Sequence, residues 1–192
     1  MPSWIINEHQ GWKGNCVIKF CDPEWENIVF KNEDSYLKRI LKAGFDGVYL
    51  DRIDTYQYWE KKGDESAKRK MIELVEKISS AIRKDSTDRK YVFVQNAPEL
   101  GTHKDYLNAI DGIGQESAFY SPNGKPVKTD TLAFYVKFLE MFRNAGKTVL
   151  TVDYISREQD IENVSVISRA LGFIPYFTSQ ELDRVGRGAV YD

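Results

Sequence analysis

The sequence predicts an α/β protein built around a parallel sheet. Its 192 residues are enough for one domain with a sizeable core, and 42% of them are hydrophobic. Short apolar runs alternate along the chain with longer segments of helical period, which is typical of strands joined by crossover helices. Polar residues follow these runs at their C-terminal ends, where parallel α/β folds bind their ligands.

The first predicted unit is a short helix followed by a strand. Residues 34–43 have one apolar face, and either Asp34 or Ser35 can cap the N-terminus of the helix. Gly44 stands where a left-handed C-terminal cap belongs. The apolar run "GVYLD" at 47–51 then predicts a strand that ends on a carboxylate.

The next two units repeat this order. Residues 64–84, starting at Asp64, carry a single apolar stripe and predict a long helix. The strand "YVFVQN" at 91–96 follows it. A shorter helix at 103–110 precedes "DGIGQE" at 111–116, whose glycines weaken it as a strand but suit a tightly packed sheet or the close approach of a ligand.

The last two units are strongly patterned. Residues 129–145 predict a long amphipathic helix, and the near-continuous apolar run at 148–154 predicts a buried strand. Ser156 and Gln159 have the spacing of a capping box for the final helix, which leads to the strand "FIPYF". Five strand units are therefore predicted.

Composition disfavours several kinds of partner. The chain has 27 Lys and Arg against 29 Asp and Glu, with both signs spread along its length, so no nucleic-acid footprint is predicted. No apolar run reaches the roughly 20 residues of a membrane span, and the first ten residues lack the pattern of a signal peptide. Cys16 and Cys21 have an odd offset that places them on opposite faces of a strand, which disfavours a disulfide between them.

Polar side chains end most of the predicted strands. In a parallel sheet these ends meet at one rim, so we expect the side chains to converge. They are Asp51, Gln95, Asn96, Glu116, Asp153 and Tyr154.

The residue types at this rim favour sugar chemistry. No glycine-rich phosphate loop or lysine follows a strand, and the chain has only two histidines, His9 and His103, so no metal or organic cofactor is predicted. Two carboxylates on one rim, Asp51 and Glu116, are the minimum equipment for cleaving a glycosidic bond. The amides of Gln95 and Asn96 can bind hydroxyl groups. Flat aromatic faces for sugar rings are available at Trp59, Tyr58, Tyr120, Tyr154 and Tyr176.

A set of segments resembles one enzyme family. "NCVIKFCDPEW", "AGFDGVYLDRIDTYQYW", "VFVQNAPEL", "IDGIGQESAFY" and "VLTVDY", spread from about Trp12 to Tyr176, look like segments of the family 114 glycoside hydrolases, the endo-α-1,4-polygalactosaminidase-like enzymes. The resemblance implies a (β/α)8 barrel, a galactosamine-containing polysaccharide as substrate, and Asp51 and Glu116 as the catalytic pair. The residues do not assign the two roles; we favour Glu116 as nucleophile and Asp51 as acid/base. Family members are usually exported.

The chain departs from this family in length. A (β/α)8 barrel takes about 250 residues. The resemblance implies about three further units before this chain, which would then be a single barrel-type domain over residues 1–192 with its C-terminal five or six units; residues 16–20 are the candidate sixth strand. We expect a homo-oligomer or a missing N-terminal segment to complete the barrel.

Several residues have structural interpretations beside the functional ones. Asp54 is predicted to cap the helix that follows it. Asn96 precedes Ala97 and Pro98, where a turn role and a ligand role are equally expected. Asp153 is expected either to support the rim through hydrogen bonds or to bind a substrate amine, and we favour the second role. Two rivals to an enzyme are a carbohydrate-binding protein without turnover and an assembly fragment with a silent rim.

Overall fold

The computed structural model describes residues 2–8, 13–84 and 88–189, so His9 and Trp12 lie outside the described residues. The chain forms two compact units, and each is described by itself. Unit 1 holds residues 1–48 and 56–91, and unit 2 holds residues 49–55 and 92–192. The predicted single barrel-type domain over residues 1–192 therefore stays a prediction.

Unit 1 is mostly helical. Its strands β1 (Ile5–Glu8) and β2 (Cys16–Ile18) pair antiparallel, so the candidate sixth strand at 16–20 belongs to a small separate sheet. Its helices are α1 (Pro23–Glu26), the π-helix η1 (Asn27–Lys31), α2 (Tyr36–Lys42), α3 (Tyr56–Lys61) and α4 (Ala67–Arg83). Cys16 and Cys21 are both free thiols and exposed.

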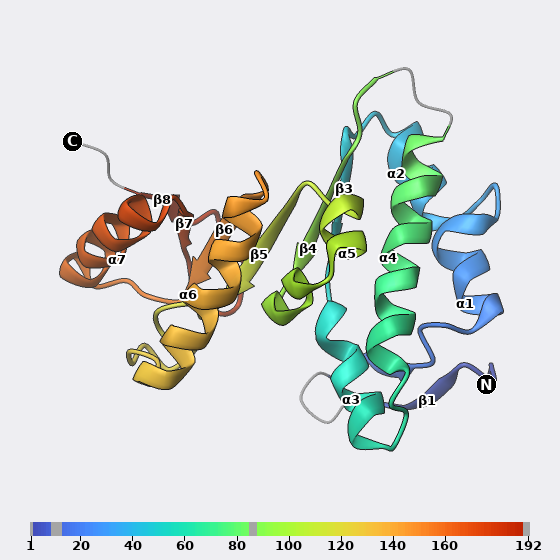
Figure 1. Cartoon of the computed structure of the whole chain (residues 1–192), viewed down its shortest axis with the longest axis horizontal. Coiled ribbons are helices and arrows are strands. Elements are labelled where there is room, and N and C mark those ends of the chain that lie inside the picture. The colour runs from blue at the N-terminus through green and yellow to red at the C-terminus, as the bar shows by residue number, and fades with distance from the viewer. Residues whose placement is uncertain (1, 9–12, 85–87, 190–192) are drawn as a thin grey trace. The chain divides into compact units, whose positions relative to one another are not determined.

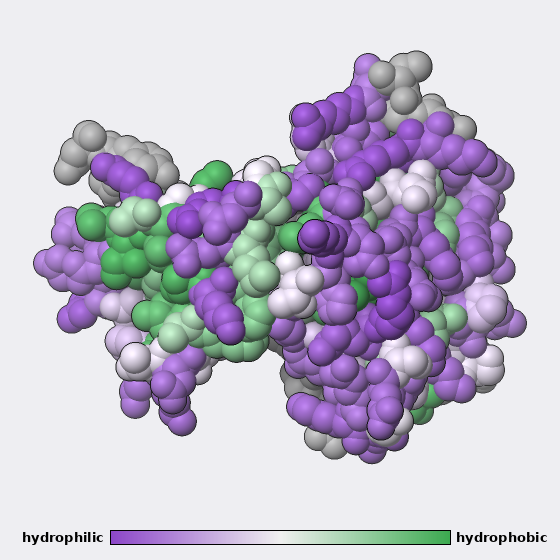
Figure 2. Space-filling view, in the orientation of Figure 1, coloured by the Kyte–Doolittle hydropathy of each residue, from purple (hydrophilic) through white to green (hydrophobic). Residues whose placement is uncertain are grey.

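The helix ends of unit 1 follow the predicted signals in part. The Ser35 hydroxyl accepts the backbone N–H of Lys38 at the start of α2, and Gly44 adopts φ 91° just beyond its end. Helix α4 starts later than predicted, because the Asp64 carboxylate accepts the N–H of Ser66 at 3.1 Å and stabilises a turn before the helix. The apolar stripe of α4 is buried, and Figure 2 shows mostly hydrophilic residues over its outward side.

Unit 2 is built on the sheet that begins with β3 (Gly47–Leu50), whose last two residues belong to this unit. The strand order is β3-β4-β5-β6-β7-β8. The other strands are β4 (Tyr91–Gln95), β5 (Gly112–Glu116), β6 (Thr148–Asp153), β7 (Ile174–Phe177) and β8 (Arg187–Gly188). Strands β4 to β7 pair in parallel, and β8 pairs antiparallel with β7. The α/β class with a parallel sheet is confirmed, whereas closure into a barrel stays a prediction, since β3 and β8 end the strand order.

Helices follow these strands as the crossover pattern predicts (Figure 1). They are η2 (Ile53–Thr55), η3 (Pro98–Thr102), α5 (Lys104–Ala109), α6 (Thr129–Asn144) and α7 (Glu158–Leu171). The predicted capping box of α7 is wrong, because Arg157 occupies the N-cap position without a side-chain hydrogen bond. Within the described residues, no helix is long and apolar enough to cross a membrane.

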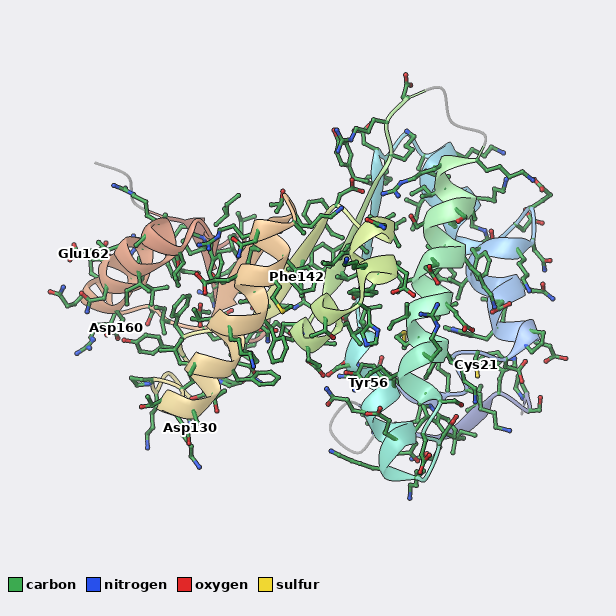
Figure 3. All side chains as sticks on the ribbon, in the orientation of Figure 1. Cys21, Tyr56, Asp130, Phe142, Asp160 and Glu162 are labelled. Atoms are coloured by element: carbon green, nitrogen blue, oxygen red, sulfur yellow. The ribbon has the colours of Figure 1, made fainter. Side chains whose placement is uncertain are left out.

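The core of unit 2 lies between the sheet and its helices. Alternate strand residues such as Val94, Ile113 and Val149 are buried, as expected for one covered face of a sheet. Phe142 of α6 packs edge-on against Tyr106 of α5, with ring centroids 6.4 Å apart (Figure 3). Both rings are fully buried, so this contact joins the two helices within the core.

Candidate active site

Glu116 ends β5, and each of its two carboxylate oxygens accepts a side-chain hydrogen bond. The Tyr154 hydroxyl donates to its Oε1, and the Asn96 amide donates to its Oε2 at 3.0 Å. Burial acts to raise the pKa of Glu116, but the hydrogen bonds from Tyr154, Asn96 and Gln95 and the nearby charge of Arg52 outweigh it and lower the pKa. Glu116 is therefore held in its ionised form.

Asn96 supports Glu116 a second time through the backbone. Its Oδ1 accepts the N–H of Glu116 at 3.1 Å and the side-chain amide of Gln115 at 3.2 Å. Asn96 adopts φ 63°, a left-handed conformation that asparagine tolerates better than most residues. The structure thus uses this side chain to position Glu116, a role that the two predicted alternatives of turn and ligand did not include.

Gln95 and Tyr49 form the neighbouring part of the rim. The Tyr49 hydroxyl donates to Oε1 of Gln95, which is 7% exposed. Burial, together with the charges of Glu116 and Asp51, raises the pKa of Tyr49 to about 12. Sequence reasoning missed Tyr49, although its position two residues before Asp51 in the predicted strand 47–51 would have placed both side chains on one face.

Glycine in β5 makes this arrangement possible. A Cβ atom at Gly114 would lie 1.7 Å from the Tyr49 hydroxyl oxygen and 2.8 Å from Oε1 of Gln95. The glycine therefore leaves the space in which a side chain from β3 reaches a side chain from β4. The prediction that glycine here serves close packing is confirmed.

Asp51 follows β3 and is exposed. Its Oδ1 accepts the backbone N–H of Arg52 at 2.6 Å, and Arg52 itself has φ 61°. Ser117, directly after β5, has φ 50°. Left-handed non-glycine residues thus come immediately after Asp51 and after Glu116, and such strained positions gather at functional sites.

Of the two roles predicted for Asp153, the structure shows the hydrogen-bonded support. Its side chain is fully buried, and Oδ1 accepts the backbone N–H groups of Phe119 and Tyr120, each at 2.8 Å. Asp153 thereby anchors the segment that follows Glu116. Its Oδ2 has no hydrogen-bond partner among the described residues, and binding of a substrate amine by this side chain stays a prediction. Burial raises its pKa to about 6, although the two N–H groups oppose the shift.

The aromatic residues that were predicted as platforms for sugar rings differ in their surroundings. Tyr154 lies at the site, as described, and burial and its bond to Glu116 raise the pKa of its hydroxyl. The Tyr120 hydroxyl donates to Asp160 of α7 at 3.0 Å (Figure 3). The Tyr176 hydroxyl accepts the N–H of Gly186 at 2.5 Å. Trp59 belongs to unit 1, where its indole N–H donates to the Ile18 carbonyl at 3.2 Å, so its role as a sugar platform stays a prediction.

A further carboxylate, Asp54, lies on η2 three residues after Asp51. It is half-buried, and burial raises its pKa. The charges of Asp51 and Glu116 act in the same direction, whereas the charge of Arg52 and a hydrogen bond from the backbone N–H of Asp54 itself oppose the shift. Across the described part of the chain, no cluster of three or more His, Cys, Asp or Glu side chains is arranged to hold a metal. The site described here consists of carboxylates, amides and tyrosines.

Carboxylates and amides at the ends of parallel strands are the residue types that glycosidases use, and the family comparison points to the same class of protein. The model of glycoside hydrolase family GH114 matches residues 1–190, and the chain belongs to this family. The predicted family resemblance is thereby confirmed.

Relatives in other organisms match nearly the whole chain. An uncharacterised protein of Methanocaldococcus jannaschii is 31% identical over 199 residues, which is 96% of this chain and 56% of the relative. An uncharacterised protein of Thermotoga maritima is 32% identical over 194 residues, which is 95% of this chain and 58% of the relative. The chain thus spans little more than half the length of these relatives.

A solved structure shares the fold. The glycoside hydrolase domain of PelA from Pseudomonas aeruginosa superimposes with a TM-score of 0.73 and 20% sequence identity. The match covers 98% of this chain and 72% of that domain. At this identity the likeness concerns the fold alone, and it supports the α/β arrangement of strands and helices.

Proposed function

We propose that this chain hydrolyses α-1,4-linked galactosamine-containing polysaccharide through paired carboxyl groups. The single observation that carries the proposal is the pair of hydrogen bonds that Tyr154 and Asn96 donate to the Glu116 carboxylate at the end of β5, which favour its ionised form. A glycosidase needs one carboxylate in this state and one carboxyl that keeps its proton. Membership of a glycoside hydrolase family supports this use of the site.

The proposed route has two steps. Glu116 attacks the anomeric carbon while an acid from the segment after β3 protonates the leaving oxygen, which gives a covalent glycosyl-enzyme. Water then hydrolyses that ester, with the same acid group now acting as base. The family resemblance assigns the acid to Asp51, and a separation of about 5 to 5.5 Å between the two carboxyl groups is what this retaining route requires.

The supporting residues have separate tasks in this proposal. Asn96 and Gln95 orient Glu116 and lower its pKa, and Tyr154 adds a third donor. Tyr120 remains a candidate platform for sugar rings. Asp153 stabilises the segment after Glu116 from within the core.

The test is release of reducing ends from α-1,4-linked galactosamine polymer. Glu116→Gln and Asp51→Asn should each lose most of the activity, because each removes one member of the proposed pair. Glu162→Gln is a matched control, since Glu162 is an exposed carboxylate on α7. Binding of the polymer without turnover, unchanged by either substitution, would replace the proposal with a carbohydrate-binding role.

A further inference from the structure

The Tyr49 side chain reaches from β3 across two neighbouring strands. Its hydroxyl donates to Oε1 of Gln95 on β4, and it lies where a Cβ atom of Gly114 on β5 would be. We propose that Tyr49 is a positioning residue for Glu116, because its hydroxyl turns the Gln95 amide so that the N–H groups of that amide face the carboxylate. This inference rests on the proposed function, in which Glu116 is the nucleophile.

Gln95 and Glu116 lie on one face of the sheet. Gln95 is in register with Gly114, and Glu116 follows Gly114 by two residues, so both side chains point to the same side. The Gln95 side chain donates a hydrogen bond to Glu116. Because Gln95 is buried, little water is available to satisfy its amide if that amide turns the wrong way.

The direction of the Gln95 amide decides what Glu116 experiences. A glutamine amide has one acceptor end and one donor end, and only the donor end stabilises a carboxylate. If the amide turned over, Oε1 of Gln95 would face the Glu116 oxygens, and two acceptors would meet. A donor on the amide oxygen opposes this turn, and Tyr49 supplies that donor. Burial and the charge of Glu116 raise the pKa of Tyr49 to about 12, so the hydroxyl keeps the proton that it donates.

Contacts within unit 2 place both ends of the Tyr49 side chain. The ring stacks on Phe93 of β4, with ring centroids 6.3 Å apart and an angle of 9° between the ring planes. Phe93 and Gln95 are alternate residues of the same strand, so their side chains share a face. Gly114 leaves room for the hydroxyl, because a Cβ atom there would overlap it. The ring is thus held against one residue of β4 while its hydroxyl bonds to the next residue on that face.

The amide of Asn96 is fixed by the same principle. Its nitrogen donates to Oε2 of Glu116, and its oxygen accepts the backbone N–H of Glu116 and the side-chain amide of Gln115. Both amides that bond to the Glu116 carboxylate therefore have a donor on their oxygen. Hydrogen bonds in a buried chain polarise one another, so a donor on the amide oxygen also strengthens the bond from the amide nitrogen. Tyr49 does this for Gln95.

The other titratable groups around Glu116 are unchanged by removal of the Tyr49 hydroxyl. Tyr154 donates to Oε1 of Glu116 from the end of β6, and the charge of Arg52 lowers the pKa of Glu116. The charge of Glu116 in turn acts on Asp54 of η2. Tyr49→Phe deletes one neutral hydroxyl and none of these groups. A change in the titration of Glu116 in this variant therefore reports the Gln95 amide.

The test follows the titration of Glu116 and needs no turnover. Carboxyl carbon NMR of the ¹³C-Glu-labelled chain identifies Glu116 as the signal that Glu116→Gln removes. Tyr49→Phe should raise the pKa of Glu116, because the amide is then free to turn its oxygen toward the carboxylate. Gln95→Leu should raise it as well, and Tyr49→Phe added to Gln95→Leu should cause no further rise. A further rise in the double variant, or an unchanged pKa in Tyr49→Phe, overturns the proposal.

Turnover provides a second readout of the same contact. On α-1,4-linked galactosamine polymer, Tyr49→Phe should lower kcat/KM about 2- to 10-fold and move the acid limb of the pH–rate profile to higher pH. Tyr91→Phe is the matched control, since Tyr91 is another exposed tyrosine of the sheet, at the start of β4. An equal shift in this control contradicts the role of Tyr49. If the wild type releases no reducing ends, the proposed function fails, whereas the titration of Glu116 still decides whether Tyr49 positions it.

Discussion

Asn96 holds Glu116 at two points, donating to its carboxylate at 3.0 Å and accepting its backbone N–H at 3.1 Å. The end of β4 thereby fixes both the side chain and the main chain at the end of β5. This double contact makes Asn96 a positioning residue for the proposed nucleophile.

Two substitutions of Asn96 should separate the effect of its hydrogen bonds to Glu116 from the effect of its left-handed backbone conformation. Asn96→Gly keeps the left-handed φ without strain and should lower kcat/KM about tenfold or more, because a hydrogen bond to a charged group is lost. Asn96→Ala should lose the same contact and in addition lower the free energy of unfolding by about 1 kcal/mol relative to the glycine variant. Denaturant unfolding of the two variants measures the difference, and equal stabilities would contradict the strain at this position.

Removal of the Tyr154 hydroxyl should shift the pH dependence of activity. Tyr154→Phe deletes a hydrogen bond that lowers the pKa of Glu116, so that pKa should rise and the acid limb of the pH–rate profile should move to higher pH. The stability that Glu116 contributes is present above its unfolded-state pKa and lost as pH falls through its folded pKa, so the variant should also lose acid stability. Tyr176→Phe is the control, since that hydroxyl accepts from Gly186; an equal shift in both variants would rule out the specific contact.

Gly114 should tolerate no side chain while Tyr49 keeps its hydroxyl. Gly114→Ala should destabilise the chain by about 1–3 kcal/mol, because its Cβ overlaps that oxygen. Adding Tyr49→Phe should recover part of the loss in a double-mutant cycle. Gly112→Ala provides the comparison, since its Cβ would meet Phe93 and the Thr148 carbonyl oxygen instead. If Tyr49→Phe restored the stability of Gly112→Ala as much as that of Gly114→Ala, the proposed overlap between the Cβ of residue 114 and the Tyr49 hydroxyl would be wrong.

The strands and the family of this chain could be predicted because local signals agree. Apolar runs, Ser35 as a cap and Gly44 as a helix end each act over a few residues, and the structure confirms them. The glycine-containing β5 was also predicted. Its reason, the Tyr49 side chain crossing above Gly114, depends on the order of the strands and could not be derived locally.

The support of the site could not be predicted for the same reason. Asp153 ends an apolar strand just as Asp51 and Glu116 do, and only its burial under Phe119 and Tyr120 shows that it serves the core. Asn96 likewise has a local turn signal, whereas its bonds to Glu116 join neighbouring strands. A carboxyl at a strand end is thus a local pattern, and its ionisation state is set by residues distant in sequence.

Asp153 should make stability fall as pH rises from about 4 to 6. Its folded pKa of about 6 lies above the ordinary value, so the folded state binds the proton more tightly and loses that advantage as the carboxyl ionises. The difference of about 2 units between the folded and the ordinary pKa of Asp153 corresponds to a loss of roughly 2–3 kcal/mol in the free energy of unfolding. Asp153→Asn keeps an oxygen for the Phe119 and Tyr120 N–H groups and should abolish this component. Guanidinium unfolding of both proteins between pH 4 and 7 gives the difference, and parallel curves would remove Asp153 as its source.

The uncovered face of the unit 2 sheet should make the chain associate. Ile174 of β7 is 52% exposed and Tyr49 is 47% exposed. Ile174 is in register with Leu150 on β6, and Leu150 is in register with Gly114 on β5. The Tyr49 hydroxyl lies where a Cβ atom of Gly114 would be. The exposed side chains of Ile174 and Tyr49 therefore lie on the same face of the sheet. Exposed apolar sheet faces of this kind associate in water, either with a second copy or with a further segment of polypeptide. Sedimentation velocity should therefore show the chain alone as an oligomer that Ile174→Lys weakens, with exposed Val185→Lys as the control. A compact and stable monomer would contradict the expectation that this face requires a cover.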